Sequence, residues 1–342
     1  MNPRTGYSYD DVLLQPARSA VDSRADVVLG TSLGGVRVDT PLVSSPMDTV
    51  TGVELAQELG DLGGLGCLHR FQSVRDQAVE AEAVVAAGVP VAGAVGIEPG
   101  YTDRADALVT AGVDMLMVDV AHGHLERTIE AVKVLAERYE CTIVAGNVAT
   151  KNGARDLVRA GADVVKVGIG NGSHCTTRKV AGVGVPQLTA ISDARAGVGD
   201  DAAIIADGGV RNPGDAVKAL VAGADAVMFG REFAATYEAP GEVVEKDGRE
   251  MKKTRGMSTS EANEDRPDTD TNIPDVDEGV SAYTPIDGSV EDVVTRYCGG
   301  LRSGFSYCGG HSVEEARENT TFIEVNDGAR LREGAHGVYR ED

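Results

Sequence analysis

One cysteine lies in a polar, glycine-rich loop whose composition suits covalent chemistry. The segment "GIGNGSHCTTR" at 168–178 follows an apolar run and places Cys175 among glycine, hydroxyl and histidine neighbours. Most free cysteines are small buried residues with inert thiols. A thiol in a polar loop near a cation such as Arg178 is better suited to act as a nucleophile. We therefore predict that Cys175 is catalytic and that Cys67 and Cys141, which lie in apolar runs, are packed.

Two glycine-bearing segments, "ADGG" at 206–209 and "MFGR" at 228–231, end successive apolar runs further along the chain. Glycine lets backbone amides approach an anion closely, as phosphate-binding turns require. Asp207 in the first segment is a candidate acceptor for ribose hydroxyls. One such segment is explained equally well by a tight turn, but two in succession favour a phosphorylated ligand.

A third polar group consists of Asp119, which ends an apolar run, and "HGH" at 122–124. Two histidines and a carboxylate can bind a metal. No further strong ligand accompanies them, so ordinary loop histidines are favoured. Asp119 is interpreted as a residue that caps a loop or positions a substrate.

Eight short apolar runs must position these residues, and amphipathic segments such as "RADALVTAGVD" separate them. Continuously apolar runs indicate strands buried on both faces, and apolar residues spaced by three and four indicate helices. The chain is therefore predicted to be α/β, a single (β/α)8 TIM barrel domain over 1–342, with an open doubly wound sheet as the alternative. The eight runs lie at 41–48, 64–69, 91–96, 115–120, 142–148, 163–169, 203–209 and 226–231.

The barrel interpretation places unusual residues together, because chemistry in such barrels lies at the carboxyl ends of the strands. Asp48, His69, Asp119, Asn147 and Asp207 all fall at such ends.

The segment at 236–290 breaks the alternating pattern after the eighth run. Its polar, densely charged composition alone indicates a disordered linker. Its position on the active side of a barrel instead predicts an insertion that forms an active-site lid, or flap. A helix is expected after it, followed by a C-terminal tail at 320–342.

The formal net charge of −22 predicts a strongly acidic surface that repels nucleic acid and anionic membranes. No apolar run reaches the ~18 residues of a membrane span, and the first residues lack an apolar signal core. We therefore expect a cytoplasmic protein with no nucleic-acid or membrane partner. The five scattered cysteines argue against a disulfide framework or zinc site. The acidity favours adaptation to high salt over a merely soluble acidic surface.

The chain resembles the IMP dehydrogenase / GMP reductase family over nearly its whole length. The resemblance is carried by "YDDVLLQP", "SSPMDTVT", "AGNVAT", "KVGIGNGSHCTTR", "GVGVPQLTA", "ADGGVR", "RGMS" and "GGLRSGFSYCG", in family order. It implies a barrel that binds a purine nucleotide (IMP or GMP), NAD or NADP, and potassium, and that forms a homotetramer. It also implies that Cys175 attacks C2 of the purine and that a hydride passes between C2 and the nicotinamide.

The resemblance further implies roles for single residues. Catalytic roles fall to Cys175, Thr177, Arg266 and Glu278. Substrate contacts fall to Ser45, Met47, Asn147, Ser173, Asp207, Gly208, Gly209, Gly230, Gly256, Met257 and Glu278. The nicotinamide cofactor would lie against Asp119, Gly168, Ile169 and Gly170. Potassium would be held by Gly170, Gly172 and Cys175, with Glu333 reaching a neighbour's potassium site.

The favoured activity is that of IMP dehydrogenase, which converts IMP, NAD and water to XMP and NADH. "SSPMDTVT", "HGH", "GVGVPQ" and the tail segment "LREGAHGV" point to it, and Arg70 stands where GMP reductases carry a catalytic lysine. GMP reductase, which converts GMP and NADPH to IMP and ammonia, is the alternative. A catalytically idle nucleotide-binding homologue is the second alternative.

Three departures from the dehydrogenase pattern accompany the resemblance. The regulatory CBS pair between the second and third strands is absent. Pro267 beside Arg266 replaces the tyrosine of an Arg-Tyr pair that activates water. Thr254 replaces a tyrosine and so loses a phosphate contact. These departures bear on regulation, hydrolysis and phosphate binding rather than on hydride transfer.

Overall fold

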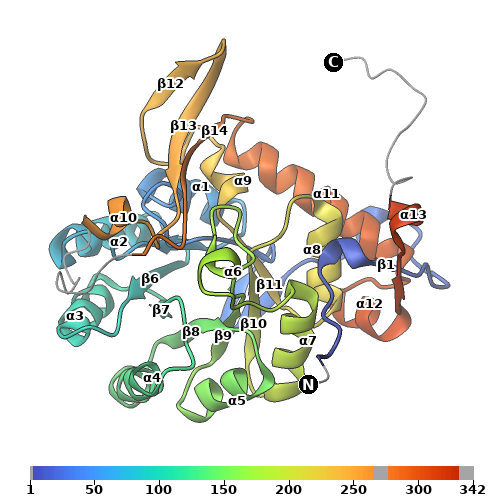
Figure 1. Ribbon diagram of the computed structural model, residues 1–342, viewed down its shortest axis with the longest axis horizontal. Helices are drawn as coiled ribbons and strands as arrows, with labels where there is room; N and C mark the ends of the chain where they lie inside the picture. The colour runs from blue at the N-terminus through green and yellow to red at the C-terminus, as the bar shows by residue number, and fades with distance from the viewer. Residues whose placement is uncertain (1–2, 265–275, 331–342) are drawn as a thin grey trace.

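Eight parallel strands form a closed barrel surrounded by helices in a computed structural model that describes residues 3–264 and 276–330 (Figure 1). The (β/α)8 prediction is confirmed, and each predicted apolar run contains one strand. Closure between the first and last strands in the order comes from Ser44 N, which donates to Leu65 O at 3.0 Å. The strands are β4 (Leu42–Ser44), β5 (Gly66–Leu68), β6 (Val91–Val95), β7 (Met115–Asp119), β8 (Thr142–Val148), β9 (Val164–Val167), β10 (Ala203–Asp207) and β11 (Ala226–Phe229), hydrogen-bonded in the order β4-β11-β10-β9-β8-β7-β6-β5.

The barrel interior is filled by apolar side chains, so it is a packed core and not a pore. Met115 and Met117 of β7 point inward to a cluster with Val43, Val144 and Ile205, among others. Successive strand residues face opposite sides, and Leu116 and Val118 accordingly join the larger core beneath the helices. A hairpin of β2 (Thr31–Leu33) and β3 (Val36–Val38) packs against the interior cluster, and Thr142 Oγ1 donates to Gly34 O at 2.7 Å.

The outer layer consists mainly of helices that return the chain between strands. Ser73, Thr150 and Ser289 begin three of them with side chains that accept backbone amides, as N-cap residues do. The helix predicted after the 236–290 segment is α11. These helices are α1 (Val53–Asp61), α2 (Val74–Ala86), α3 (Tyr101–Ala111), α4 (Glu126–Arg138), α5 (Lys151–Arg159), α7 (Gln187–Val198), α8 (Pro213–Val221) and α11 (Val290–Tyr307).

The described part of 236–290 is largely folded, contrary to what its composition alone indicates. β12 (Val243–Lys246), β13 (Arg249–Arg255) and β14 (Ser281–Pro285) form an antiparallel sheet that projects from the barrel, and α10 (Ser260–Glu264) lies at its base (Figure 1). We call the described part of 243–285, which contains β12–β14 and α10, the flap. Arg266 and Pro267 lie outside the described residues.

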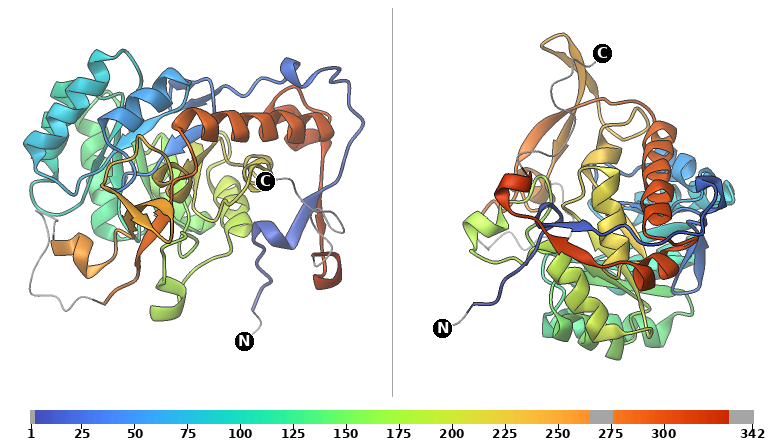
Figure 2. Two further views of the ribbon diagram at one scale, coloured as in Figure 1. Left: turned by 90° about the horizontal axis from the view of Figure 1, so that it is seen from above. Right: turned by 90° about the vertical axis from the view of Figure 1, so that its right-hand side faces the viewer.

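Two short segments near the ends of the described chain pair in a small sheet that the sequence did not predict. β1 (Val12–Leu14) pairs antiparallel with β15 (Phe322–Glu324), and the two run side by side in Figure 2. Short helices complete this side of the molecule: α12 (Val313–Asn319) and α13 (Asp327–Arg330). Glu333 lies outside the described residues. Among the described helices, none has the length and apolar character that crossing a membrane requires.

Candidate active site

A cleft of about 1150 Å³ opens at the carboxyl ends of the barrel strands, and the flap contributes to its wall. Each site residue predicted from the sequence lines this cleft, apart from Arg266 and Glu333, which fall outside the described residues. The shared location follows from the barrel, which brings strand ends far apart in sequence to one rim. Its lining includes Ser45, Met47, Asp119, Asn147, Gly168, Ile169, Gly170, Gly172, Ser173, Cys175, Thr177, Asp207, Gly208, Gly209, Gly230, Gly256, Met257 and Glu278.

Cys175 lies half-buried in the loop between β9 and α6 (Thr177–Val180). Its thiol donates to Thr177 Oγ1 at 3.1 Å. The flap fixes this loop: Thr176 N donates to Glu278 O at 2.8 Å, and Val280 N donates to His174 O at 3.0 Å. The cysteine is therefore presented to the cleft by backbone bonds that connect the barrel to the flap.

Arg178, the cation predicted near the thiol, makes its hydrogen bonds to other atoms. Its guanidinium donates to Asn171 Oδ1 and to Val185 O, so its hydrogen bonds brace the loop and do not reach Cys175. Burial raises the pKa of the Cys67 and Cys141 thiols, as expected of packed cysteines.

A buried lysine that the sequence analysis missed lies beneath the cleft. The side chain of Lys166 is 3% exposed, and its Nζ lies 2.8 Å from Asp119 Oδ1 and 2.8 Å from Asp207 Oδ2. Nζ also donates to Asn147 Oδ1, and Asn147 Nδ2 donates to Asp207 Oδ2 at 2.9 Å. Burial lowers the pKa of Lys166, but the charges of Asp119 and Asp207 outweigh burial and raise it above the usual lysine value.

A glycine allows close contact between the two strand ends beside these carboxylates. At Gly168, with φ 153°, an added Cβ would lie 2.0 Å from Asp207 O, so the ends of β9 and β10 touch through their backbones. Gln187, also missed, donates its Nε2 to Val167 O at 2.8 Å and to Asp207 O at 3.0 Å. A glutamine at the start of a helix carries no sequence signal for this role.

Hydroxyl groups gather where the cysteine loop meets the flap. His174 Nδ1 lies 3.0 Å from Ser173 Oγ, and its Nε2 lies 2.8 Å from Thr254 Oγ1. Thr254 Oγ1 also lies 2.8 Å from Thr284 Oγ1. Burial, assisted by the charge of Arg231, lowers the pKa of His174. Ser173 and Thr254 are thus joined through one histidine at the edge of the cleft.

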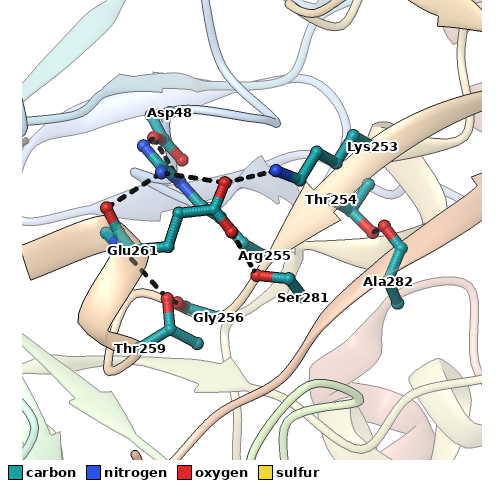
Figure 3. A network of polar contacts seen from close by, with 10 residues as sticks. Asp48, Lys253, Thr254, Arg255, Gly256, Thr259, Glu261, Ser281 and Ala282 are labelled. Carbon is teal, nitrogen blue, oxygen red and sulfur yellow. Dashed lines mark hydrogen bonds and ion pairs between the residues drawn. The ribbon is translucent and has the colours of Figure 1, made fainter.

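An ionic network holds the base of the flap to the barrel (Figure 3). Arg255 at the end of β13 donates its Nε to Asp48 Oδ2 at 2.9 Å, and its second contact with that oxygen is shorter. Arg255 Nη1 also donates to Glu261 O at 3.1 Å, while Lys253 and Ser281 bind the Glu261 carboxylate. The side chains of Asp48 and Arg255 are 13% and 11% exposed.

The two histidines of "HGH" do not converge on Asp119. His124 Nε2 lies 3.1 Å from Asp156 Oδ2, and His122 lines the cleft. Over residues 3–264 and 276–330, no group of three or more His, Cys, Asp or Glu is placed to hold a metal. Arg70 is buried and donates its Nε to Asp119 O at 3.3 Å, which brings its cation to the rim of the cleft.

Comparison with known proteins agrees with this geometry. A model of the IMP dehydrogenase / GMP reductase domain matches residues 6–336. The inosine-5'-monophosphate dehydrogenase of Nitrosopumilus maritimus is 31% identical over 474 aligned residues, covering 99% of each chain. That of Chlorobaculum parvum is 48% identical over 71% of this chain, but this chain spans only 51% of that protein's length. A solved GMP reductase of Trypanosoma brucei, in complex with guanosine 5'-monophosphate, has a TM-score of 0.93 at 29% identity, covering 99% of each chain.

Proposed function

Because the chain belongs to the IMP dehydrogenase / GMP reductase family, we propose that it is an oxidoreductase that converts IMP, NAD and water to XMP and NADH. The observation that carries the proposal is the position of Cys175. Its thiol lies in a cleft that also contains the glycine-rich ends of β10 and β11 and, across the barrel mouth, Asp119. A nucleotide and a nicotinamide on these walls would both face the thiol.

The nucleotide is proposed to bind along the wall that carries the glycines. The amides of Gly209 and Gly230, with Ser173, suit a phosphate, and Asp207 suits the ribose hydroxyls. Ser45, Met47, Asn147 and Gly208 complete this wall, and Gly256, Met257 and Glu278 approach from the flap to contact the base.

Cys175 supplies the nucleophile. Its sulfur forms a bond to C2 of the hypoxanthine, and the C2 hydrogen leaves with its electron pair as hydride, so the purine is oxidised. The resulting thioimidate is cleaved by water, which releases XMP and restores the thiol. Thr177, 3.1 Å from the sulfur, is placed to exchange a proton with the thiol. Glu278 is proposed to assist from the flap, and Arg266 to activate water.

The nicotinamide is proposed to accept the hydride while bound against Asp119, Gly168, Ile169 and Gly170. These residues suit it, because glycine at 168 and 170 keeps that wall free of side chains and Asp119 offers an acceptor.

A potassium ion is proposed near the cysteine loop, with carbonyls of Gly170, Gly172 and Cys175 as ligands and Glu333 from a neighbour. Carbonyl oxygens suit a hard cation. Gly172 O also accepts Cys175 N at 3.1 Å, which leaves its second lone pair for an ion. A homotetramer, which the family resemblance implies, and a cytoplasmic location are also part of the proposal.

GMP reductase is the second candidate, because the solved GMP reductase noted above shares the fold at a TM-score of 0.93. Arg70 favours the dehydrogenase. Loss of ammonia from GMP calls for a group that can give a proton to the departing amine, and arginine does not deprotonate in proteins.

The test is a paired assay of the purified protein, followed at the nicotinamide absorbance. Absorbance should rise with IMP plus NAD and stay constant with GMP plus NADPH. NADPH loss with GMP alone would establish the reductase, and silence in both with tight IMP binding would establish an idle homologue. Cys175→Ala should abolish turnover, and retained turnover would refute the covalent mechanism.

A further inference from the structure

Lys166 connects the two halves of the proposed site at one buried nitrogen. An ammonium carries three donors, and here they meet Asp119 of β7, Asn147 of β8 and Asp207 of β10. Each carboxylate turns a single oxygen to the lysine, Oδ1 from Asp119 and Oδ2 from Asp207. The second oxygen of each carboxylate is thereby left for the cleft that both residues line.

We propose that Lys166 is a positioning residue that holds the side chains of Asp119 and Asp207 close together on one ammonium, and so aligns the cofactor and nucleotide subsites. The inference rests on the proposed function, in which Asp119 serves the cofactor and Asp207 the nucleotide ribose. Nothing in that proposal gives Lys166 a direct contact with either ligand.

The geometry makes this cation necessary. Both carboxylate oxygens lie 2.8 Å from the same Nζ, so they are separated by no more than twice that distance. Two carboxylates this close, with side chains only 20% and 22% exposed, repel each other strongly without a cation between them.

Other groups near the cluster do not replace the lysine. Tyr9 and Cys67 face it from the N-terminal segment and β5, but burial raises the pKa of both, so they remain neutral. Arg70 reaches the cluster through the backbone oxygen of Asp119. Asn147 donates to Asp207 but carries no charge. Among the described side chains near the pair, Lys166 is the one whose ammonium contacts both carboxylates.

Removing the ammonium of Lys166 should shift the pH dependence of activity in one direction. Without the ammonium, the close negative charges of the cluster favour the binding of a proton as the pH falls. Activity is then lost at a higher pH than in the wild type as the pH falls. We expect Lys166→Met to move the acid limb of the kcat/KM profile up by about one to three pH units.

The variant should also lower kcat/KM about 100-fold at neutral pH, since a displacement of about 1 Å in a reacting pair has that scale. The KM values for IMP and NAD should both rise, because one residue of each subsite is released. Lys166→Arg keeps the charge and is expected to return the acid limb towards the wild-type position. Lys133→Met, an exposed lysine of α4, is the matched control and should leave the profile unchanged.

The experiment measures kcat/KM against pH for the full-length wild type, Lys166→Met, Lys166→Arg and Lys133→Met. An unmoved acid limb in Lys166→Met, or a rise in only one KM, would overturn the inference. If Lys166→Met does not fold, the double variant Lys166→Met/Asp207→Asn is used in its place. It keeps only the Asp119 carboxylate of the pair, so it should fold because the repulsion between the two carboxylates is gone. Failure of both variants to fold would show that the lysine is purely structural.

Failure of the proposed function gives a different result. In that case the wild type itself turns over neither IMP with NAD nor GMP with NADPH. The inference is then tested by calorimetric titration with IMP at acidic and neutral pH. Lys166→Met should lose IMP affinity more steeply than the wild type as the pH falls, and parallel losses would refute the role of Lys166.

Discussion

Replacing Arg255 by glutamine is expected to release the flap from the barrel without unfolding the barrel. Arg255 ends β13 and contacts Asp48, which follows β4, so the ion pair bridges the two parts at the base of the flap (Figure 3). Asp48 gives the arginine a single oxygen, Oδ2. Glutamine retains much of the side-chain volume and hydrogen-bonding ability but removes the charge.

The magnitude follows from burial. Removing one partner of a fully buried ion pair costs about 3–5 kcal/mol. The side chains of Asp48 and Arg255 are 13% and 11% exposed, so solvent screens the pair in part. The expected loss in the free energy of flap docking is therefore about 2–3 kcal/mol. At about 1.4 kcal/mol per factor of ten, the equilibrium between docked and released flap shifts about 30- to 140-fold.

Hydrogen exchange measures this shift directly. Amides of β13 and β14 should exchange faster by that factor in Arg255→Gln, while those of β8 in the barrel should not change. Since the flap also fixes the cysteine loop through Glu278 and Val280, kcat/KM should fall as well. Arg249→Gln, at the exposed far end of the same strand, is the matched control.

Two results would refute this reasoning. Equal exchange of β13 in Arg255→Gln and the wild type would show that the pair does not hold the flap. Faster exchange in β8 as well would show that the pair stabilises the whole fold and not the flap alone. A double-mutant cycle with Asp48→Asn would then measure the coupling between the two side chains.

Three further predictions concern the thiols, the glycine contacts and the charge. Iodoacetamide should modify Cys175 before the other cysteines. Burial raises the pKa of the other four thiols, those of Cys67, Cys141, Cys298 and Cys308. Earlier alkylation of any of these four in peptide mass spectra would contradict the prediction. Gly168→Ala should lower the free energy of unfolding, measured with a chemical denaturant, by at least about 3 kcal/mol. Gly199→Ala, whose added Cβ meets nothing within 4 Å, should lower it by about 1 kcal/mol. Equal losses in the two variants would refute the backbone contact at Gly168. The thermal midpoint should rise between about 0.1 and 3 M KCl, because counterions screen the net charge of −22, and equal midpoints would argue against adaptation to high salt.

The barrel could be predicted because each of its strands lies in a continuous apolar run of the sequence. Each of the eight runs is buried on both faces, so apolar residues mark it directly. The paired strands β1 and β15 could not be predicted, since both are partly exposed and each partner lies more than three hundred positions away. The folded part of the flap was hidden for a related reason: its strands are exposed and carry the charged composition of a linker.

Part of the candidate site could likewise be predicted from the sequence, and part could not. Cys175, Asp119 and Asp207 could be identified because polar residues after apolar strands are conspicuous, and the barrel then requires their side chains to share one rim. Lys166 lies inside the apolar run of β9 and was therefore read as part of the strand. A lone lysine within an apolar run is itself a signal, because a buried ammonium needs hydrogen-bond acceptors, and carboxylates are the strongest of these. Asp119 and Asp207, already candidates at the ends of β7 and β10, are the carboxylates that contact Lys166.

Thr254 shows why a single substitution is hard to interpret from sequence. In place of a tyrosine, Thr254 implied a lost phosphate contact. In the structure its hydroxyl lies 2.8 Å from both His174 Nε2 and Thr284 Oγ1, and His174 also contacts Ser173. The position is thus part of a hydrogen-bonded group at the edge of the cleft, whose members are contributed by the cysteine loop and two flap strands. Their pairing depends on how the flap docks, so the consequence of the threonine could be assessed only after the fold had placed His174 against it.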